Sequence, residues 1–312
     1  MVDRAGDRNA ELAARLAHAH LLVVGGIRTP ARNESVCSSV VDRYPLPTLF
    51  RTEMTSPTEL LDASVAAWHE SIDAFCRLQD VGFVERGAHG TKAIYSGAPV
   101  SVLNAVISMT RQPDVDEIRL LSGAFSTCGV PWSIQTRDAS TQADEIRRIA
   151  DDHGLTQCVA LPFMTKRLER VAAPANSDGQ VVVRRVTAAD SERYNGALAA
   201  GYEAPEGVFR RLSAPAVLEA DGMMGFWVEV DGMPVATSFG VVRNAQVGVF
   251  NVSTLPAYRR RGYARAATQA VLDAAFETGA HTAFLHCTPA GRHVYESMGF
   301  TTGEEWQVYV GG

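Results

Sequence analysis

Lysine is the scarcest charged residue in this chain. Among 312 residues only Lys92 and Lys166 are lysines, so arginine supplies the rest of the positive charge; we draw no function from that. The formal net charge is −6, so binding to nucleic acid has no electrostatic support across the whole chain. We therefore expect no nucleic-acid partner.

Cysteine is also sparse and is not arranged for metal binding. The five cysteines are odd in number and widely scattered, and no Cys-x-x-Cys pair or His/Cys cluster has the spacing of a zinc site. This pattern is typical of free thiols in a reducing compartment. We expect no metal. The cysteines stand at positions 37, 76, 128, 158 and 287.

No apolar run approaches the roughly 18 residues of a membrane helix. The run LLVVGG at 21–26 is too short, and the polar start MVDRAGDRNAEL lacks the hydrophobic region of a signal peptide. Hydrophobic and charged contents of 46% and 21% are those of an ordinary globular protein, long enough for two domains. We expect a cytoplasmic protein with no membrane partner.

The most informative stretch of the sequence is the turn at residues 251–265. The β-branched run VGVFNVSTL at 247–255 predicts a strand, Pro256 breaks it, and three arginines and Gly262 follow. The run AATQAVLDAAF, from 266 on, has helical spacing. A strand, a basic loop and a helix start bring backbone N–H groups, a helix dipole and guanidinium donors together, which suits a phosphate-bearing ligand. Gly262 permits positive φ, and Ala264 keeps the first helical turn small.

This region resembles the GNAT superfamily of N-acetyltransferases. The pattern Arg259-x-x-Gly262-x-Ala264 after a strand is similar to that family's acyl-CoA pyrophosphate loop. A predicted helix (264–278), a strand HTAFLHC, a short helix from Ala290 and the sequence VYESMGF follow in the family's order. The resemblance covers roughly residues 180–310, and its specific motifs lie within 251–300.

The resemblance implies acetyl-CoA as cofactor and assigns roles to particular residues. Tyr295 matches the tyrosine beside the sulfur and is the candidate general acid for the leaving thiolate. In the family the strand before the loop carries a bulge, and its backbone pairs with the pantetheine arm and the acyl oxygen. Thr288 either contacts the cofactor or caps the next helix. The implied cofactor-binding set is Val252, Ser253, Thr254, Arg259, Arg260, Arg261, Gly262, Tyr263, Ala264, Arg265 and Thr288.

A base or a water chain is also needed, because a free alkyl ammonium has a pKa near about 10.4 and must be neutral to attack. His286 and Glu229 are weak candidates for that base. His286 lies on a predicted strand, where a histidine is more often structural.

The element order repeats along the chain, which predicts two tandem GNAT-like domains of mixed α/β (α+β) class, each a mostly antiparallel sheet flanked by helices. We divide the chain into a poorly readable extension (1–56), a degenerate copy (57–171) and a catalytic copy (181–312). In the first copy Asp114, Asp116 and Glu117 stand at the helix start. Carboxylates there would repel a pyrophosphate, so we expect that copy to form a wall of the acceptor cleft or to stabilise the second.

The predicted function is acetyl transfer from acetyl-CoA to a primary amine of a small molecule, by direct attack in a ternary complex. Two alternatives stay open: a non-catalytic acyl-CoA-binding sensor, and transfer to a hydroxyl acceptor. The protein is expected to be a monomer or homodimer.

Overall fold

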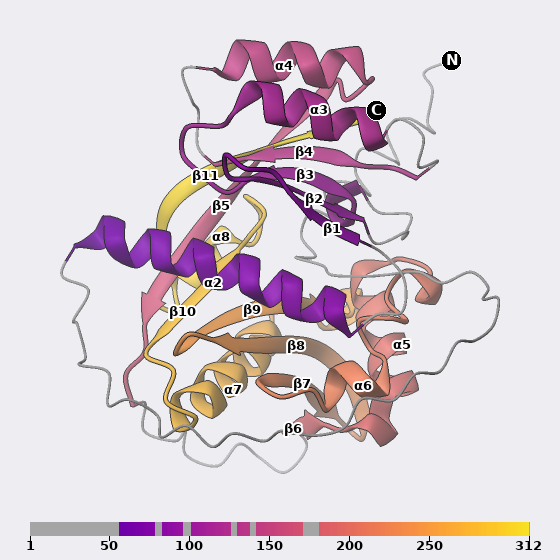
Figure 1. Ribbon diagram of the computed structural model, residues 1–312. Helices are drawn as coiled ribbons and strands as arrows, with labels where there is room; N and C mark the ends of the chain where they lie inside the picture. The colour runs from indigo at the N-terminus through magenta and orange to yellow at the C-terminus, as the bar shows by residue number, and fades with distance from the viewer. Residues whose placement is uncertain are drawn as a thin grey trace, which may run out of the picture.

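A computed structural model describes residues 56–78, 83–95, 101–125, 130–137, 142–170 and 181–311. Its centre is a single eleven-stranded sheet in the order β1-β2-β3-β4-β11-β5-β10-β9-β8-β7-β6. Figure 1 shows the sheet twisting from the N-terminal strands at the top to β6 and β7 at the bottom, with the long helix α2 lying across it. The mixed, mostly antiparallel sheet with flanking helices is as predicted.

The N-terminal half begins with helix α2 (Pro57–Arg77). Its start is fixed by a reciprocal cap, because the Ser56 hydroxyl accepts a hydrogen bond from the Glu59 N–H and the Glu59 carboxylate accepts one from the Ser56 N–H, each at 3.2 Å. The remaining elements of this half are β1 (Phe83–Arg86), β2 (Thr91–Tyr95), a 3-10 turn (Ser101–Leu103), β3 (Ala105–Ser108), α3 (Val115–Phe125), β4 (Ser133–Thr136), α4 (Ala143–Asp152) and β5 (Gln157–Arg167).

The C-terminal half repeats that order with longer strands. The predicted hairpin at Asp231-Gly232 is confirmed, since these two residues join β7 and β8. The elements are β6 (Val181–Val186), α5 (Ser191–Tyr202), α6 (Pro215–Leu218), β7 (Met223–Val230), β8 (Met233–Arg243), β9 (Gln246–Thr254), α7 (Tyr263–Glu277), β10 (Thr282–His286), α8 (Arg292–Glu296) and β11 (Thr301–Val310), with 3-10 turns at Ala188–Asp190, Glu206–Val208 and Pro256–Tyr258.

The last strand of each half is paired with strands of the other half. Strand β11 pairs with β4 and β5, while β5 of the N-terminal half also pairs with β10 of the C-terminal half. Each half contributes one parallel pair, β3 with β4 and β9 with β10, and all the other pairs are antiparallel. The two halves therefore form one continuous sheet, which the sequence repeat did not predict.

The helices cover both faces of this sheet. On β10, Phe284 packs in the core beneath α2 and α5, whereas Ala283 and Leu285 pack in the core beneath α7 and α8. Because successive strand residues point to opposite faces, these two helix pairs lie on opposite sides. Helices α3 and α4 share a third core with Tyr309 of β11.

The sequence also places Pro113 in the first turn of a helix, but α3 begins at Val115. It further favours a short helix at 11–20, a strand at 21–24 and a linker at 172–180, and these three segments lie outside the described residues. Among the residues that are described, no helix is long and apolar enough to cross a membrane.

Candidate functional site

Strands β9 and β10 separate at one end. Their pairing runs from Gln246–Thr282 to Gly248–Phe284, yet β9 continues to Thr254. On its other edge β9 pairs with β8, and there the register shifts between Phe239–Phe250 and Thr237–Ser253. Strand β9 thus holds one extra residue, a β-bulge at 251–252, and Asn251 has φ of 52°. The bulge implied by the resemblance is present.

The basic loop leads from β9 into the start of α7. Arg260 and Gly262 both have positive φ (61° and 83°), and Gly262 is the residue before the helix. A Cβ built on Gly262 would meet no atom within 4 Å, so open space lies beside the turn. The first N–H groups of α7 have no partner within the helix and carry its positive dipole end. This turn therefore presents a positively polarised backbone to that space.

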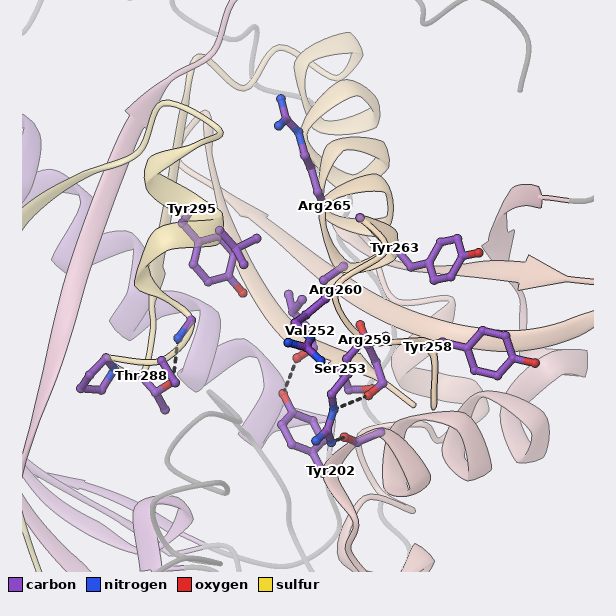
Figure 2. A pocket seen from close by; sticks show the side chains of 18 of the residues that line it. Tyr202, Val252, Ser253, Tyr258, Arg259, Arg260, Tyr263, Arg265, Thr288 and Tyr295 are labelled. Atoms are coloured by element: carbon purple, nitrogen blue, oxygen red, sulfur yellow. Dashed lines mark hydrogen bonds between the residues drawn. The ribbon is translucent and has the colours of Figure 1, made fainter. Parts of the chain in front are cut away.

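A cavity of about 710 Å³ lies between this turn, the free edge of β9 and α8 (Figure 2). That volume is in the range of pockets that hold cofactors or drug-sized ligands. Its lining residues are Val159, Gly201, Tyr202, Val252, Ser253, Thr254, Tyr258, Arg259, Arg260, Gly262, Tyr263, Ala264, Arg265, Thr288, Pro289, Ala290, Gly291, Val294 and Tyr295.

The arginines of the loop take different positions. Arg260 and Arg265 line the cavity, whereas Arg261 lies outside its lining with its guanidinium 5.4 Å from the centre of the Tyr258 ring. Arg259 lines the cavity but donates hydrogen bonds to the carbonyls of Thr254 and Gly201 and pairs with Glu203. We infer that Arg259 holds the loop onto α5 and that Arg260 and Arg265 carry the charge facing the cavity.

Tyr295 is brought to the opposite wall by the short helix α8. Its side chain is buried, its ring meets Phe300 edge-on with centroids 6.0 Å apart, and Figure 2 shows it facing the cavity. Burial and the neighbouring Cys287 raise the pKa of Tyr295 above its usual value. Its hydroxyl therefore keeps its proton at neutral pH.

Thr288 lies at the cavity and at the entry to α8. It lines the cavity, and its hydroxyl accepts a hydrogen bond from the Gly291 N–H at 3.2 Å, at the entry to α8. Figure 2 shows it below Tyr295 on the same wall.

The two candidate bases lie elsewhere. His286 is buried among aromatic rings, 4.6 Å from Trp306 and 4.8 Å from Phe163 between ring centres, and is not part of the lining. Glu229 pairs with Arg184 at 3.4 Å and Arg193 at 3.6 Å, also away from the cavity. These positions give no support to either residue as the base.

Sequence reasoning missed Tyr202. It is the last residue of α5, it lines the cavity, and its hydroxyl donates a hydrogen bond to the Val252 carbonyl at 2.9 Å. In the sequence it ends an unremarkable helical stretch, ADSERYNGALAAGY, which lies far from the motif. Nothing local marks it, because its contact with the bulge joins segments fifty residues apart.

At the corresponding helix start of the N-terminal half, two carboxylates accept backbone hydrogen bonds. Glu117 of α3 is buried and accepts hydrogen bonds from the His89 and Thr91 N–H groups at 2.6 and 3.0 Å. Burial opposes its ionisation, but these hydrogen bonds prevail and lower the pKa of Glu117. Asp114 accepts the Glu117 N–H at 2.9 Å and so caps the helix.

No group of three or more His, Cys, Asp or Glu residues within the described ranges has the arrangement of a metal site. The polar groups of the cavity lining are backbone groups, the hydroxyls of tyrosine, serine and threonine, and guanidinium groups.

Comparison with known proteins agrees with this geometry. Residues 194–300 match the model of the acetyltransferase (GNAT) family, which places a GNAT domain in the C-terminal half. No curated protein sequence matches the chain.

Three solved structures are similar to the chain in fold. A GCN5-related N-acetyltransferase from Kribbella flavida is 19% identical, with 81% of this chain and 96% of that one covered, and a TM-score of 0.59. A functionally unknown conserved protein from Staphylococcus epidermidis is 10% identical, with coverage of 78% and 98% and a TM-score of 0.54. A GCN5-related N-acetyltransferase from Sphaerobacter thermophilus is 12% identical, with coverage of 80% and 88% and a TM-score of 0.53.

Proposed function

We propose that the chain is an acetyl-CoA-dependent N-acetyltransferase that acts on a small-molecule primary amine in a ternary complex. The observation that carries this proposal is the single cavity lined by three features: the free, bulged edge of β9, the basic start of α7 and the buried Tyr295. A diphosphate, a thioester and a leaving sulfur each have a suitable group there.

The residues present fit coenzyme A. Open space beside Gly262, the N–H groups of the first turn of α7 and the side chains of Arg260 and Arg265 suit a diphosphate. The edge of β9 beyond Gly248 is not paired with β10, so Val252, Ser253 and Thr254 offer backbone groups to an extended amide chain. Thr254, Tyr263, Ala264 and Thr288 complete the proposed binding set.

Acetyl-CoA, when bound, supplies an acetyl group as a thioester, and its transfer replaces a C–S bond by a C–N bond while one proton passes from the amine to the sulfur. Backbone N–H groups at the 251–252 bulge are placed to polarise the acyl oxygen. Tyr295 holds a proton for the sulfur. Burial raises the pKa of Tyr295, so its hydroxyl stays protonated until the leaving sulfur takes the proton, and the same burial disfavours a free thiolate.

The N-terminal half belongs to this proposal as a degenerate GNAT-like copy. Three observations support a tandem arrangement: the repeated element order, one parallel strand pair in each half and the pairing of each half's last strand with strands of the other half. We propose copies at 57–171 and 181–312, with cofactor binding confined to the second. Glu117 at the α3 start supports that restriction.

A thiol-release assay tests the function. Panels of primary amines and of alcohols are incubated with acetyl-CoA and the full chain, free thiol is measured, and products are identified by mass spectrometry. An acetamide product that depends on the protein supports the proposal. Ester products would assign a hydroxyl acceptor. Binding of acetyl-CoA without thiol release from any member of either panel would indicate a sensor.

A further inference from the structure

Tyr202 is held firmly against strand β9. Gly201 lets α5 approach β9 closely, since a Cβ there would lie 2.2 Å from the Ser253 hydroxyl oxygen. The Tyr202 ring is buried and stacks on Phe209 with centroids 5.2 Å apart. Its hydroxyl donates to the Val252 carbonyl at 2.9 Å. The hydroxyl oxygen is therefore fixed beside the bulge.

This hydroxyl faces the same cavity as Tyr295, from the other wall. Figure 2 shows Tyr295 above and Tyr202 below, with Val252 between them. Burial and then the neighbouring Tyr295 raise the pKa of Tyr202 well above its usual value, so both phenols remain protonated at neutral pH. The two hydroxyls thus flank the point where β9 exposes its bulge.

The hydrogen bond of Tyr202 determines how its hydroxyl can bind a further ligand. Because the Tyr202 O–H is directed to a carbonyl, its oxygen meets a further ligand as a hydrogen-bond acceptor. A neutral amine has N–H donors beside its lone pair, so an acceptor oxygen can orient that lone pair. Resting on the function proposed above, we propose that Tyr202 binds the N–H of the acceptor amine and directs its nitrogen toward the acyl carbon beside Val252.

The experiment uses hydroxylamine, a small nucleophile that is uncharged at neutral pH. With saturating acetyl-CoA, Tyr202→Phe is expected to lower the second-order rate constant of thiol release at least tenfold. Its dissociation constant for coenzyme A, measured by calorimetry, should stay within twofold. Tyr194→Phe is the matched control, because Tyr194 also lies on α5 and its hydroxyl donates to a strand carbonyl, that of Ser238 at 3.3 Å, outside the cavity lining.

The outcomes separate this inference from the proposed function. An unchanged rate in Tyr202→Phe would overturn the role of Tyr202, as would an equal loss in Tyr194→Phe. A parallel loss of coenzyme A affinity would do so too, since it would mean that the hydroxyl only supports the bulge. No thiol release from the unaltered chain, with hydroxylamine or any amine, would instead refute the transferase function itself.

Discussion

The two parallel strand pairs of the sheet have the same topology, but they differ at the end where the strands lead into the following helix. One pair separates there and the other does not. In the C-terminal half β9 runs on past its last β10 partner at Gly248 and leaves a bulged free edge. In the N-terminal half β3 ends at Ser108, one residue after its last β4 partner at Ile107. The same connection of strand, helix and strand therefore leaves an unpaired edge in the C-terminal half and none in the described part of the N-terminal half. Topology alone does not make a site.

Side chains complete the closure in the N-terminal half. Arg137, directly after β4, is buried and reaches the Met109 carbonyl, Asp62 of α2 and Glu304 of β11, the last at 2.8 Å. These contacts join the ends of β3 and β4 to α2 and to β11. Where the C-terminal half has a cavity, the described part of the N-terminal half thus has ion pairs.

The largest expected effect follows from breaking that closure. Arg137→Met leaves Glu304 buried without its principal partner, which should lower the free energy of unfolding by about 3–5 kcal/mol. Urea denaturation measures it. Arg111→Met is the control, because Arg111 pairs with Asp62 while 43% exposed, and such pairs contribute about 1 kcal/mol or less. Equal losses in both variants would show that Arg137 is no special link.

The second prediction concerns the open half. Tyr295→Phe should lower turnover about 100-fold, because proton donation is worth roughly that factor, while coenzyme A affinity stays nearly intact. Steady-state kinetics and calorimetry measure the two quantities. Tyr309→Phe removes a buried tyrosine hydroxyl outside the cavity and serves as control. Unchanged turnover in Tyr295→Phe would mean that the sulfur obtains its proton elsewhere.

The third prediction separates neighbouring arginines. Arg260→Glu should weaken coenzyme A binding about tenfold, and more so at low salt, because its charge faces the cavity. Arg261→Glu should have a smaller effect, since that guanidinium lies over Tyr258. Calorimetry at two salt concentrations gives both constants and the stoichiometry, which should be one coenzyme A per chain. Two per chain would contradict a non-binding N-terminal half.

The smallest effect is expected at Glu117. Folding lowers its pKa, so its ionised form stabilises the fold fully above the ordinary carboxyl pKa, and this contribution disappears as pH falls through the lowered value. Glu117→Gln should cost about 1 kcal/mol at pH 7, and the difference from the unaltered chain should shrink toward pH 3. Thermal unfolding across that range measures it. Asp116→Asn, whose side chain is 94% exposed, should show no such trend.

The sequence predicted most of the elements, because hydrophobic periodicity and the cap at Ser56 are local signals. It also located the loop from Arg259 to Arg265, whose spacing is local as well. It did not predict that Arg261 lies outside the lining or that Arg259 is taken up by Gly201 and Glu203. Those outcomes depend on contacts between segments distant in the chain.

The pairing of β5 and β11 with strands of the other half could not be predicted from the sequence, for the same reason. Strands β5 and β11 each follow a helix that is succeeded by a glycine and an apolar residue, and this local pattern does not specify a pairing partner. Which edge each strand occupies is decided by packing across the whole sheet, as for Trp306 of β11, which is buried against α2. A repeat in the sequence therefore indicates two similar units without indicating how they are joined.

The pairing of strands between the halves also means that the C-terminal half depends on a strand of the N-terminal half. Strand β10 is flanked by β5 through five residue pairs, and the Cys287 N–H donates to the Pro162 carbonyl at 3.0 Å immediately before Thr288. If residues 181–312 were produced alone, the edge of β10 that pairs with β5 would be exposed to solvent. Strand β11 would also lose both of its partners, β4 and β5. Such a fragment is expected to aggregate through these unpaired strand edges. The N-terminal half therefore contributes to the C-terminal half by covering the edge of β10.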